Sequence, residues 1–273
     1  MHAWVNGELL EDPGGPVLSV RDHGLVVGDG VFETIKVVDG QPFALFRHLD
    51  RLAGSAAGLG LDAIDEKQVR RGVAAVLGAE HLSMGKLRIT CTGGPGPFGS
   101  GRGDGPPTVV VVADTLSDRQ AAAAVATVPW PRNERGALAG LKTTSYAENV
   151  VALEYAARRG ADEAVFANTV GVLCEGTGSN VFYVVDGELR TPSLKSGCLA
   201  GVTRALLLEW VGAREVDEQI DVLYTADEVF LASTTRDVQP VQRCDERDLS
   251  APGPVTAHCL EVWAAKEAEN PDP

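Results

Sequence analysis

Lys142 is the first residue of this chain whose type and surroundings suggest chemistry. It lies in the segment LAGLKTTSYAEN, after an apolar stretch that contains glycine and before a cluster of hydroxyl side chains. A semi-buried lysine is costly unless its charge is paired or lost, and an amine whose pKa is lowered by desolvation is suited to Schiff-base formation. A lysine at a helix terminus or on the surface would fit the segment equally well. Taken alone, Lys142 therefore leaves a catalytic and a structural interpretation open.

A carboxylate, Glu175, stands at the start of an apolar run that predicts a buried strand, in CEGTGSNVFYV. Gly176, Gly178 and Ser179 follow it. Their small size lets a ligand approach the backbone closely, and they offer N–H and hydroxyl donors. Pyridoxal phosphate (PLP) needs an anion near its ring nitrogen, because a protonated pyridinium is the better electron sink. The alternative is a solvated glutamate in a surface hairpin.

Three further segments offer groups that bind a phosphate. GCLAGVTRALLLEW places small residues at the start of a predicted helix, where free N–H groups and the helix dipole attract anions, although Thr203 there would also serve as a plain N-cap. LASTTRDVQPV ends a strand in three hydroxyl side chains, a possible anion nest. Arg51 in HLDRL offers a bidentate guanidinium or an ion pair with Asp50 or Asp62. The candidates are Gly201, Val202, Thr203, Ser233, Thr234, Thr235 and Arg51.

The elements that must position these residues form two α/β halves. In the first half, VFETIKVVDGQPFAL predicts a hairpin that turns at Asp39-Gly40. A loop at 93–107 is too rich in glycine and proline for regular structure. The remaining predicted elements of this half are helices at 46–61 and 67–77 and strands at 85–92 and 106–114.

The second half mixes short strands with helices, and it ends in a charged tail that we expect to be frayed. Strands and helices do not alternate regularly enough for a doubly wound parallel sheet. We therefore expect an N-terminal α/β domain at 1–114, an interdomain linker at 115–123 and a C-terminal domain at 124–273. The predicted elements of this half are strands at 124–128, 163–168, 171–175, 180–185, 188–192, 229–233 and 240–244 and helices at 149–159, 203–212 and 255–268.

Composition narrows the classes of function. The 273 residues are 44% hydrophobic and 23% charged, which is typical of a soluble globular protein. A formal charge of -14 argues against a nucleic-acid partner, which needs a basic face. No apolar run is long enough to span a membrane, and the N-terminal residues lack a signal-peptide pattern. Five scattered cysteines without zinc-like spacing fit reduced thiols in a cytoplasm, and no metal site is expected.

With these residues in view, the chain resembles the fold-type IV, PLP-dependent class IV aminotransferase family, which includes branched-chain aminotransferases, D-amino acid aminotransferases and 4-amino-4-deoxychorismate lyases. The resemblance runs nearly end to end and includes RDHGLVVGDGVFETIKV, HLDRL, LKTTSYAENVVA and STTRDVQPV. The family signature is met by Glu175, Asn180, Val181, Phe182, Thr191, Gly201, Val202 and Arg204.

The resemblance implies a role for each candidate. Lys142 would bind the PLP aldehyde as a Schiff base, Glu175 would pair with the ring nitrogen, and Tyr146 would lie near the ring hydroxyl. Arg51, Val202, Thr203 and Thr234 would hold the phosphate; Ser179, Asn180, Gly201 and Ser233 are further candidates for cofactor binding. The implied fold is an N-terminal α/β sandwich and a C-terminal pseudo-barrel. The active site would lie between the two domains and would be completed by the neighbouring subunit of a homodimer.

The member of the family is harder to assign. Branched-chain enzymes tend to carry VFEGIR where this chain has VFETIK; Thr34 with Lys36 is similar to the lyases, and STTRDVQPV is similar to the D-amino acid enzymes. The strand KLRITCTGG lacks the Arg-x-His pair of well-known bacterial D-enzymes, so Arg88 is either the substitute carboxylate ligand or a structural residue. The candidates for substrate binding are Phe32, Thr34, Lys36, Arg88 and Thr235.

We therefore expect an enzyme that moves an amino group between an amino acid, such as D-alanine or D-glutamate, and a 2-keto acid. A 4-amino-4-deoxychorismate lyase that releases 4-aminobenzoate and pyruvate is the close alternative, and a branched-chain L-amino acid aminotransferase is the second. A phosphate-ligand binding protein without catalysis is a rival from another class. A cysteine-dependent acyl-transfer enzyme has little support, since the five histidines offer no recognisable partner motif.

Overall fold

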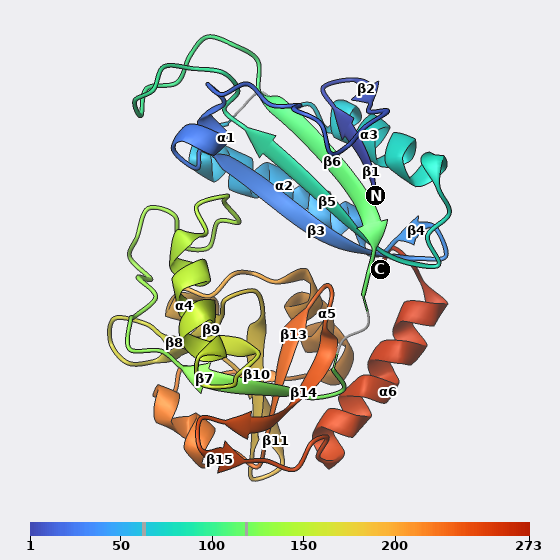
Figure 1. Ribbon diagram of the computed structural model, residues 1–273. Helices are drawn as coiled ribbons and strands as arrows, with labels where there is room; N and C mark the ends of the chain where they lie inside the picture. The colour runs from blue at the N-terminus through green and yellow to red at the C-terminus, as the bar shows by residue number, and fades with distance from the viewer. Residues whose placement is uncertain (62–63, 118–119) are drawn as a thin grey trace. The chain divides into compact units, whose positions relative to one another are not determined.

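The computed structural model describes residues 1–61, 64–117 and 120–273, and the chain divides into two compact units (Figure 1). Unit 1 consists of Met1–Ser117, Leu141–Tyr146 and Pro271–Pro273; unit 2 consists of Asp118–Gly140 and Ala147–Asn270. Lys142 and Tyr146 thus belong to unit 1, although the sequence places them in the second domain. Residues 118–119 of the expected linker lie outside the described residues.

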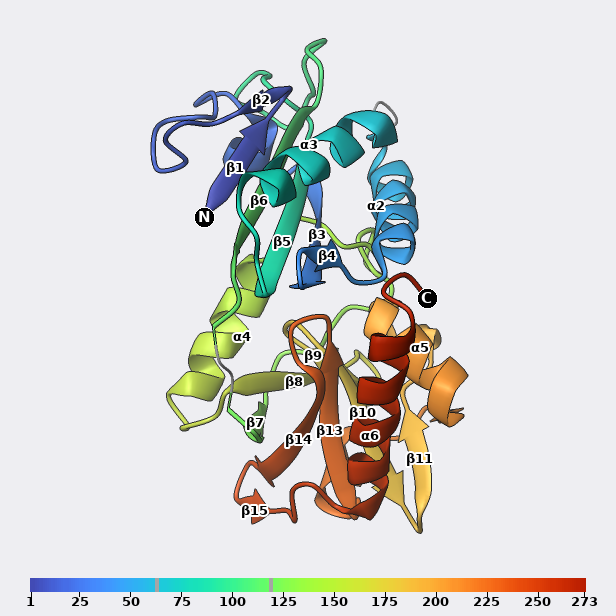
Figure 2. The same cartoon turned by 90° about the vertical axis from the view of Figure 1, so that its right-hand side faces the viewer.

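Unit 1 is a two-layer α/β sandwich, as expected. Its antiparallel six-stranded sheet has the order β2-β1-β6-β5-β3-β4. Helices α2 and α3 cover one face of this sheet (Figure 2), and the apolar core lies between the two layers. The strands are β1 (His2–Val5), β2 (Glu8–Leu9), β3 (Gly30–Val38), β4 (Gln41–Pro42), β5 (Met84–Thr92) and β6 (Thr108–Thr115). The helices are α1 (His23–Val26), α2 (Leu45–Leu59) and α3 (Glu66–Ala79).

The predicted hairpin forms and gives β3 two different faces. Asp39 and Gly40 turn the chain with positive φ angles of 47° and 77°, a backbone conformation that Asp and Gly tolerate better than most residues. Because side chains alternate along a strand, Val31 and Ile35 pack into the helix-covered core. Phe32 and Lys36 lie on the opposite face.

Unit 2 is built on a nine-stranded mixed sheet, as expected for the pseudo-barrel. Its order is β12-β11-β10-β13-β14-β7-β8-β9, with β15 paired to β14. The sheet curls, because the short turn 177–179 joins β9 at one end of this order directly to β10. The strands are β7 (Ala123–Thr127), β8 (Glu163–Ala167), β9 (Leu173–Gly176), β10 (Asn180–Val185), β11 (Glu188–Thr191), β12 (Arg214–Glu215), β13 (Glu228–Ser233), β14 (Asp237–Cys244) and β15 (Arg247–Asp248).

Among the described residues of unit 2, three α-helices pack on this sheet. Small side chains of α4, Ala152 and Ala156, lie against the alanines of β7 and β8, and α5 and α6 lie side by side over β13 (Figure 2). The helices are α4 (Ala147–Ala157), α5 (Val202–Val211) and α6 (Pro254–Glu269), with short 3-10 turns η1 (Leu194–Ser196) and η2 (Ile220–Tyr224).

The charged tail is not frayed, contrary to our expectation. Helix α2 begins after Ala44, which has a left-handed backbone (φ 53°). Its alanine side chain cannot accept a hydrogen bond and so does not cap the helix. The tail supplies the missing acceptors instead: the Ala44 amide donates to the Pro271 carbonyl (2.8 Å), and the Phe46 amide donates to Asp272 Oδ1 (3.0 Å). The carboxylate of Asp272 therefore acts as the N-terminal cap of α2.

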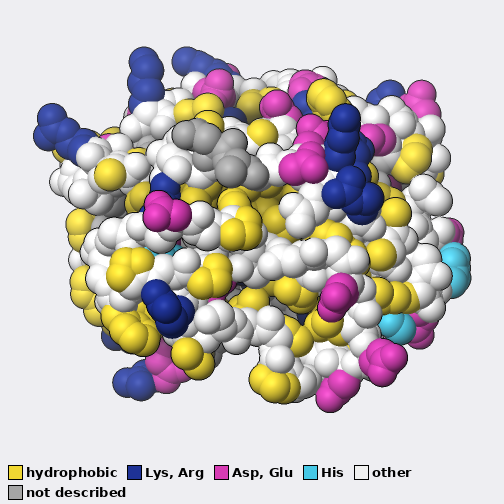
Figure 3. All heavy atoms as spheres, turned by 90° about the horizontal axis from the view of Figure 1, so that it is seen from above, with side chains coloured by type: hydrophobic (Ala, Val, Ile, Leu, Met, Phe, Trp, Pro, Cys, Tyr) yellow, Lys and Arg dark blue, Asp and Glu magenta, His cyan; other side chains and the backbone are white. Residues whose placement is uncertain are grey.

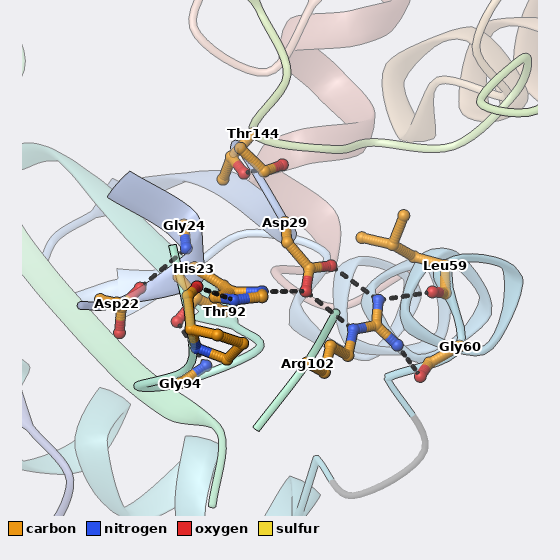
Figure 4. Close-up of polar contacts among 12 residues, drawn as sticks. Asp22, His23, Gly24, Asp29, Leu59, Gly60, Thr92, Gly94, Arg102 and Thr144 are labelled. Atoms are coloured by element: carbon orange, nitrogen blue, oxygen red, sulfur yellow. Dashed lines mark hydrogen bonds and ion pairs between the residues drawn. The ribbon is translucent and has the colours of Figure 1, made fainter. Parts of the chain in front are cut away.

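The glycine-rich loop 93–107 is also fixed, through Arg102 (Figure 4). The Arg102 guanidinium donates to both carboxylate oxygens of Asp29, at 2.7 and 2.6 Å, and to the Leu59 carbonyl (2.8 Å) and the Gly60 carbonyl at the end of α2. On the other side of Asp29 lies the buried His23, with Nδ1 3.5 Å from the carboxylate. The hydrogen bond from Arg102 holds the pKa of Asp29 below its usual range.

The surface carries charges of both signs. On the face seen in Figure 3, Lys and Arg side chains lie scattered among Asp and Glu side chains rather than in one patch. Within residues 1–61, 64–117 and 120–273, no helix is both long enough and apolar enough to cross a bilayer.

Replacing Arg102 with glutamine should loosen the loop and destabilise unit 1. Arg102→Gln leaves Asp29 without its guanidinium, and we expect a loss of roughly 1–3 kcal/mol at neutral pH. A lowered carboxyl pKa contributes stability above its unfolded value and loses it as the pH falls, so the difference from wild type should shrink in acid. Hydrogen exchange of β3 and β5 amides in urea measures the effect.

The matched control is Arg70→Gln, which removes an exposed ion pair with Glu66 on α3. Such pairs contribute about 0.3–0.5 kcal/mol. Equal effects of the two substitutions would show that Arg102 does not fix the loop.

Candidate active site

The segment that carries Lys142 is held by its main chain between β3 and α2. The Phe32 amide donates to the Lys142 carbonyl (3.0 Å), and the Thr144 amide donates to the Gly30 carbonyl (2.8 Å). On the other side, the Lys142 amide donates to Ser55 Oγ of α2 (3.1 Å). With its backbone fixed on both sides, Lys142 retains a four-carbon side chain as its mobile part.

Phe32 brings four of the predicted site residues together within unit 1. The Nζ atom of Lys142 lies 4.5 Å from the centroid of the Phe32 ring, and the Cζ atom of Arg88 lies 3.9 Å from it. The Tyr146 ring contacts Phe32 edge-on, with 5.1 Å between centroids. Desolvation lowers the pKa of Arg88, although a guanidinium remains charged in proteins. An amine, a permanent cation and a phenol thus surround one buried aromatic ring.

Thr34 and Lys36 lie on the same face of the sheet as Phe32. Thr34 is the cross-strand partner of Arg88, and Lys36 is the partner of Lys86. Directly paired residues of antiparallel strands point to the same side, so this face carries several cations. Lys36 is buried, and its Nζ lies 5.6 Å from the Phe43 ring.

Arg51 is oriented by a buried carboxylate that the sequence analysis missed. Its Nε and Nη2 atoms donate to both oxygens of Glu33, at 2.8 and 2.6 Å, and His48 Nδ1 lies 2.7 Å from the same carboxylate. The expected alternative partner Asp62 lies outside the described residues. A carboxylate among the core-facing side chains of β3 was the available signal, because a fully buried glutamate needs partners.

The charge states of Glu33 and His48 follow from their burial beside Arg51. Desolvation alone would raise the pKa of Glu33, but the charge and hydrogen bonds of Arg51, with help from His48, outweigh it and lower the pKa to about 2. Burial lowers the pKa of His48 more than Glu33 raises it. Glu33 is therefore an anion at neutral pH, and it holds the guanidinium of Arg51 in one orientation.

Glu175 is not a solvated turn residue. It lies on β9 opposite Phe166 of β8, and its side chain is only 13% exposed. Its Oε2 atom accepts the Leu199 amide (2.9 Å), and its Oε1 atom lies 3.3 Å from Nε of Arg132. The Arg132 guanidinium lies over the Phe166 ring at 4.1 Å. No sequence signal pointed to Arg132, which is far from Glu175 along the chain.

Asn180 fixes the segment that leads into α5. Its Nδ2 atom donates to the Leu199 carbonyl (2.9 Å). A Cβ atom at Gly201 would lie 2.0 Å from Asn180 Oδ1, so any other residue there would require the Asn180 side chain to shift. The hydroxyl of Ser179 donates to Glu163 (3.2 Å).

The start of α5 has the features of an anion site. Gly201 is the N-cap residue, and no side chain caps the helix within the part of the chain that the structure describes. Thr203 is therefore not the N-cap that the sequence also allowed; it lies buried in the first turn with Val202. Uncapped N–H groups of a first turn suit a phosphate, so the donor set fits the phosphate of PLP.

The hydroxyl cluster lies at a tight connection in the sheet. Ser233 ends β13, and Thr234 and Thr235 form the half-buried turn to β14. The predicted residues therefore fall into two sets. Unit 1 carries Phe32, Thr34, Lys36, Arg51, Arg88, Lys142 and Tyr146; unit 2 carries Glu175, Ser179, Asn180, Gly201, Val202, Thr203, Ser233, Thr234 and Thr235.

Comparison with known proteins agrees with this chemistry. The family model described as amino-transferase class IV matches residues 30–244. The chain is 33% identical over 259 residues to a putative branched-chain-amino-acid aminotransferase of Methanocaldococcus jannaschii, covering 90% of this chain and 89% of the relative. It is also 33% identical over 245 residues to a bifunctional aminodeoxychorismate lyase / D-amino acid transaminase of Mycobacterium tuberculosis, covering 82% of each.

A solved structure shares the fold and names the cofactor. It is a hypothetical aminotransferase from Mycobacterium tuberculosis in a PLP-bound form, which superposes with a TM-score of 0.85 at 28% identity and covers 97% of this chain and 98% of its own. Enzymes of this family depend on PLP. The chain therefore belongs to the class IV aminotransferases of fold type IV, and its cofactor is PLP.

Proposed function

We propose that this aminotransferase moves the amino group of a D-amino acid, such as D-alanine or D-glutamate, to a 2-keto acid. The observation that carries the proposal is the cluster on Phe32, where the amine of Lys142 and the guanidinium of Arg88 lie 4.5 and 3.9 Å from one ring centroid. The amine is the group that binds the PLP aldehyde, and the guanidinium is suited to the carboxylate of an amino acid.

Each remaining residue has a place in the proposal. When bound, PLP supplies an electrophilic aldehyde and a conjugated ring that withdraws electrons from the substrate α-carbon. Once the substrate amine has displaced it from the aldehyde, the free amine of Lys142 would take the proton from that carbon and later return one, as a general base and acid. Glu175 would keep a proton on the ring nitrogen, and Tyr146 would lie beside the ring hydroxyl.

The phosphate is the anchor of the cofactor in this proposal. Arg51, preset by Glu33, supplies a charged donor, and the first turn of α5 supplies the amides of Val202 and Thr203 together with the hydroxyl of Thr203. Thr234, with Ser233, adds hydroxyl donors. Asn180 and Gly201 hold the start of α5 in shape, and both stay predicted cofactor-binding residues.

A lyase that forms 4-aminobenzoate and pyruvate is the second candidate. It is favoured by the match to a relative whose name combines aminodeoxychorismate lyase with D-amino acid transaminase. Thr34 and Lys36 lie on the same sheet face as Arg88, so a substrate with a second carboxylate would meet a second cation. The name of the archaeal relative keeps branched-chain L-amino acids as a third possibility.

We also propose that the enzyme is a homodimer. Helix α4 carries three apolar side chains with large exposed fractions, Val150 (66%), Val151 (54%) and Leu153 (41%). A monomer rarely leaves such a group facing water, and a two-fold interface would cover the same patch on both copies.

Loss of Lys142 should abolish covalent binding of PLP. In wild type, reduction with borohydride should fix PLP to the peptide that contains Lys142, as peptide mass spectrometry would show. Lys142→Ala should lose both this adduct and the visible absorbance of the bound cofactor. Lys67→Ala, at an exposed position on α3, is the matched control and should keep both. An adduct on another lysine would refute the assignment.

Substrate preference separates the three candidate reactions. We expect the holoenzyme to form pyruvate from D-alanine with 2-ketoglutarate faster than it deaminates L-leucine, and Arg88→Gln to lower kcat/KM about tenfold or more by removing a charged hydrogen bond. Production of 4-aminobenzoate from aminodeoxychorismate, with D-alanine inert, would favour the lyase. An unchanged kcat/KM in Arg88→Gln would remove Arg88 from the site.

Breaking the apolar surface of α4 should dissociate the dimer. Val150→Glu combined with Val151→Glu places two charges in the proposed interface, and light scattering after size exclusion should report a monomer. Glu154→Gln, on the same helix, is the control and should remain dimeric. A monomeric wild type would contradict the proposal.

A further inference from the structure

Glu163 is a buried acid that the proposed chemistry leaves unused. It is the first residue of β8 and is 1% exposed. Its Oε1 atom accepts the Thr177 amide (3.0 Å), the Thr177 hydroxyl and its neighbour's amide at Ala164 (3.0 Å), and its Oε2 atom accepts the Ser179 hydroxyl (3.2 Å). A charge is buried at this cost only where several donors meet it.

All of these donors except the Ala164 amide belong to the turn that follows Glu175. Residues 177–179 join β9 to β10, and the turn is wrapped so closely that a Cβ atom at Gly176 would lie 2.5 Å from Ser179 Oγ and 3.2 Å from Cδ of Glu163. Pairing of β8 with β9 places Glu175 opposite Phe166 on the same strand that Glu163 begins. Glu163 therefore holds the turn on the C-terminal side of Glu175.

The same carboxylate reaches the hydroxyl-rich turn between β13 and β14. Nη2 of Arg236 lies 3.4 Å from Oε2 of Glu163, and Nη1 of Arg236 donates to Gln239. The Arg236 amide closes the turn by donating to the Ser233 carbonyl (3.1 Å). Gln239 is fixed in turn, because its Nε2 donates to the Gln120 carbonyl (2.8 Å).

We propose that Glu163 and Arg236 are positioning residues that couple two parts of the PLP site, the turn 177–179 beside Glu175 and the turn 233–236 that contains Thr234. The inference rests on the proposed function, which assigns Glu175 to the ring nitrogen and Thr234 to the phosphate. Neither Glu163 nor Arg236 needs to touch the cofactor. The buried charge of Glu163 makes the position of one turn depend on the other, since its oxygens are shared between them.

The coupling distinguishes this role from a merely structural one. Arg236→Gln should weaken mainly the binding of the PLP phosphate, because Arg236 lies within the turn that contains Thr234. Glu163→Gln keeps the shape of the side chain but replaces an acceptor oxygen by a donor amide, so both turns lose their common partner. The double variant should then be little worse than Glu163→Gln alone, because the two residues act through one contact.

Dissociation constants of the apoprotein for PLP and for pyridoxal, which lacks the phosphate, provide the test. We expect Arg236→Gln to weaken PLP about tenfold, or about 1.4 kcal/mol, and to leave pyridoxal unchanged. Glu163→Gln should weaken both ligands. The 31P resonance of bound PLP should shift in both variants, and the 15N resonance of its ring nitrogen should shift in Glu163→Gln.

The matched control is Glu188→Gln, in a half-exposed arginine cluster of the same unit, which should alter neither constant. Additive effects in the double variant, or unchanged constants in Glu163→Gln, would overturn the coupling. If Glu163→Gln does not fold, Arg236→Gln and Ser179→Ala give the same comparison across the two turns. Loss of affinity in Thr234→Ala and a shifted 15N resonance in Glu175→Gln verify the proposed function separately, so failure of the coupling alone is recognisable.

Discussion

Hydrogen bonds between β3 and the segment that carries Lys142 are the contacts on which the chemistry of unit 1 depends. The Phe32 amide donates to the carbonyl of Lys142, and Ser55 Oγ of α2 accepts a hydrogen bond from the Lys142 amide. The same strand presents Phe32 to the lysine on one face and Glu33 to Arg51 on the other. One nine-residue strand therefore contacts the Lys142 amine, the Arg88 guanidinium and, through Glu33, the guanidinium of Arg51.

Buried or nearly buried carboxylates keep the irregular segments rigid. Glu33, Asp29 and Glu163 each meet a guanidinium from another segment. Burying such a charge is expensive, and removing its partner leaves the charge uncompensated. These acids consequently do not add much net stability. Their effect is to make one arrangement of the joined segments more favourable than the others: Asp29 and Glu163 fix loops and turns, and Glu33 fixes β3 against α2.

The sequence predicts the regular elements well, because their signals are local. The hairpin at Asp39-Gly40 follows from turn residues between two β-rich runs, and α2 follows from its apolar spacing and its glycine end. Lys142 and Glu175 were found as candidates from their neighbours in the chain. The alternative interpretation of Thr203 as an N-cap was wrong by two residues, since Gly201 takes that position.

The residues that escaped prediction act over long separations in the chain. Arg132 reaches Glu175 from 43 positions away, and Glu163 reaches Arg236 from 73. Hydrophobic periodicity reports which side of an element is buried, but it does not report which buried polar groups meet. The prediction for the tail was wrong for the same reason. Its composition is typical of a frayed end, but Asp272 of the tail caps the start of α2, where Ala44 offers no capping side chain.

The interrupted course of the chain has a consequence for recombination between relatives. Unit 1 is assembled from three separate stretches, and the six residues around Lys142 are encoded between two stretches of unit 2. A chimera with its crossover near residue 117 would combine β3 of one parent with the lysine segment of another. Transplanting a specificity from one parent would therefore require moving the coding sequence for 141–146 together with the N-terminal half.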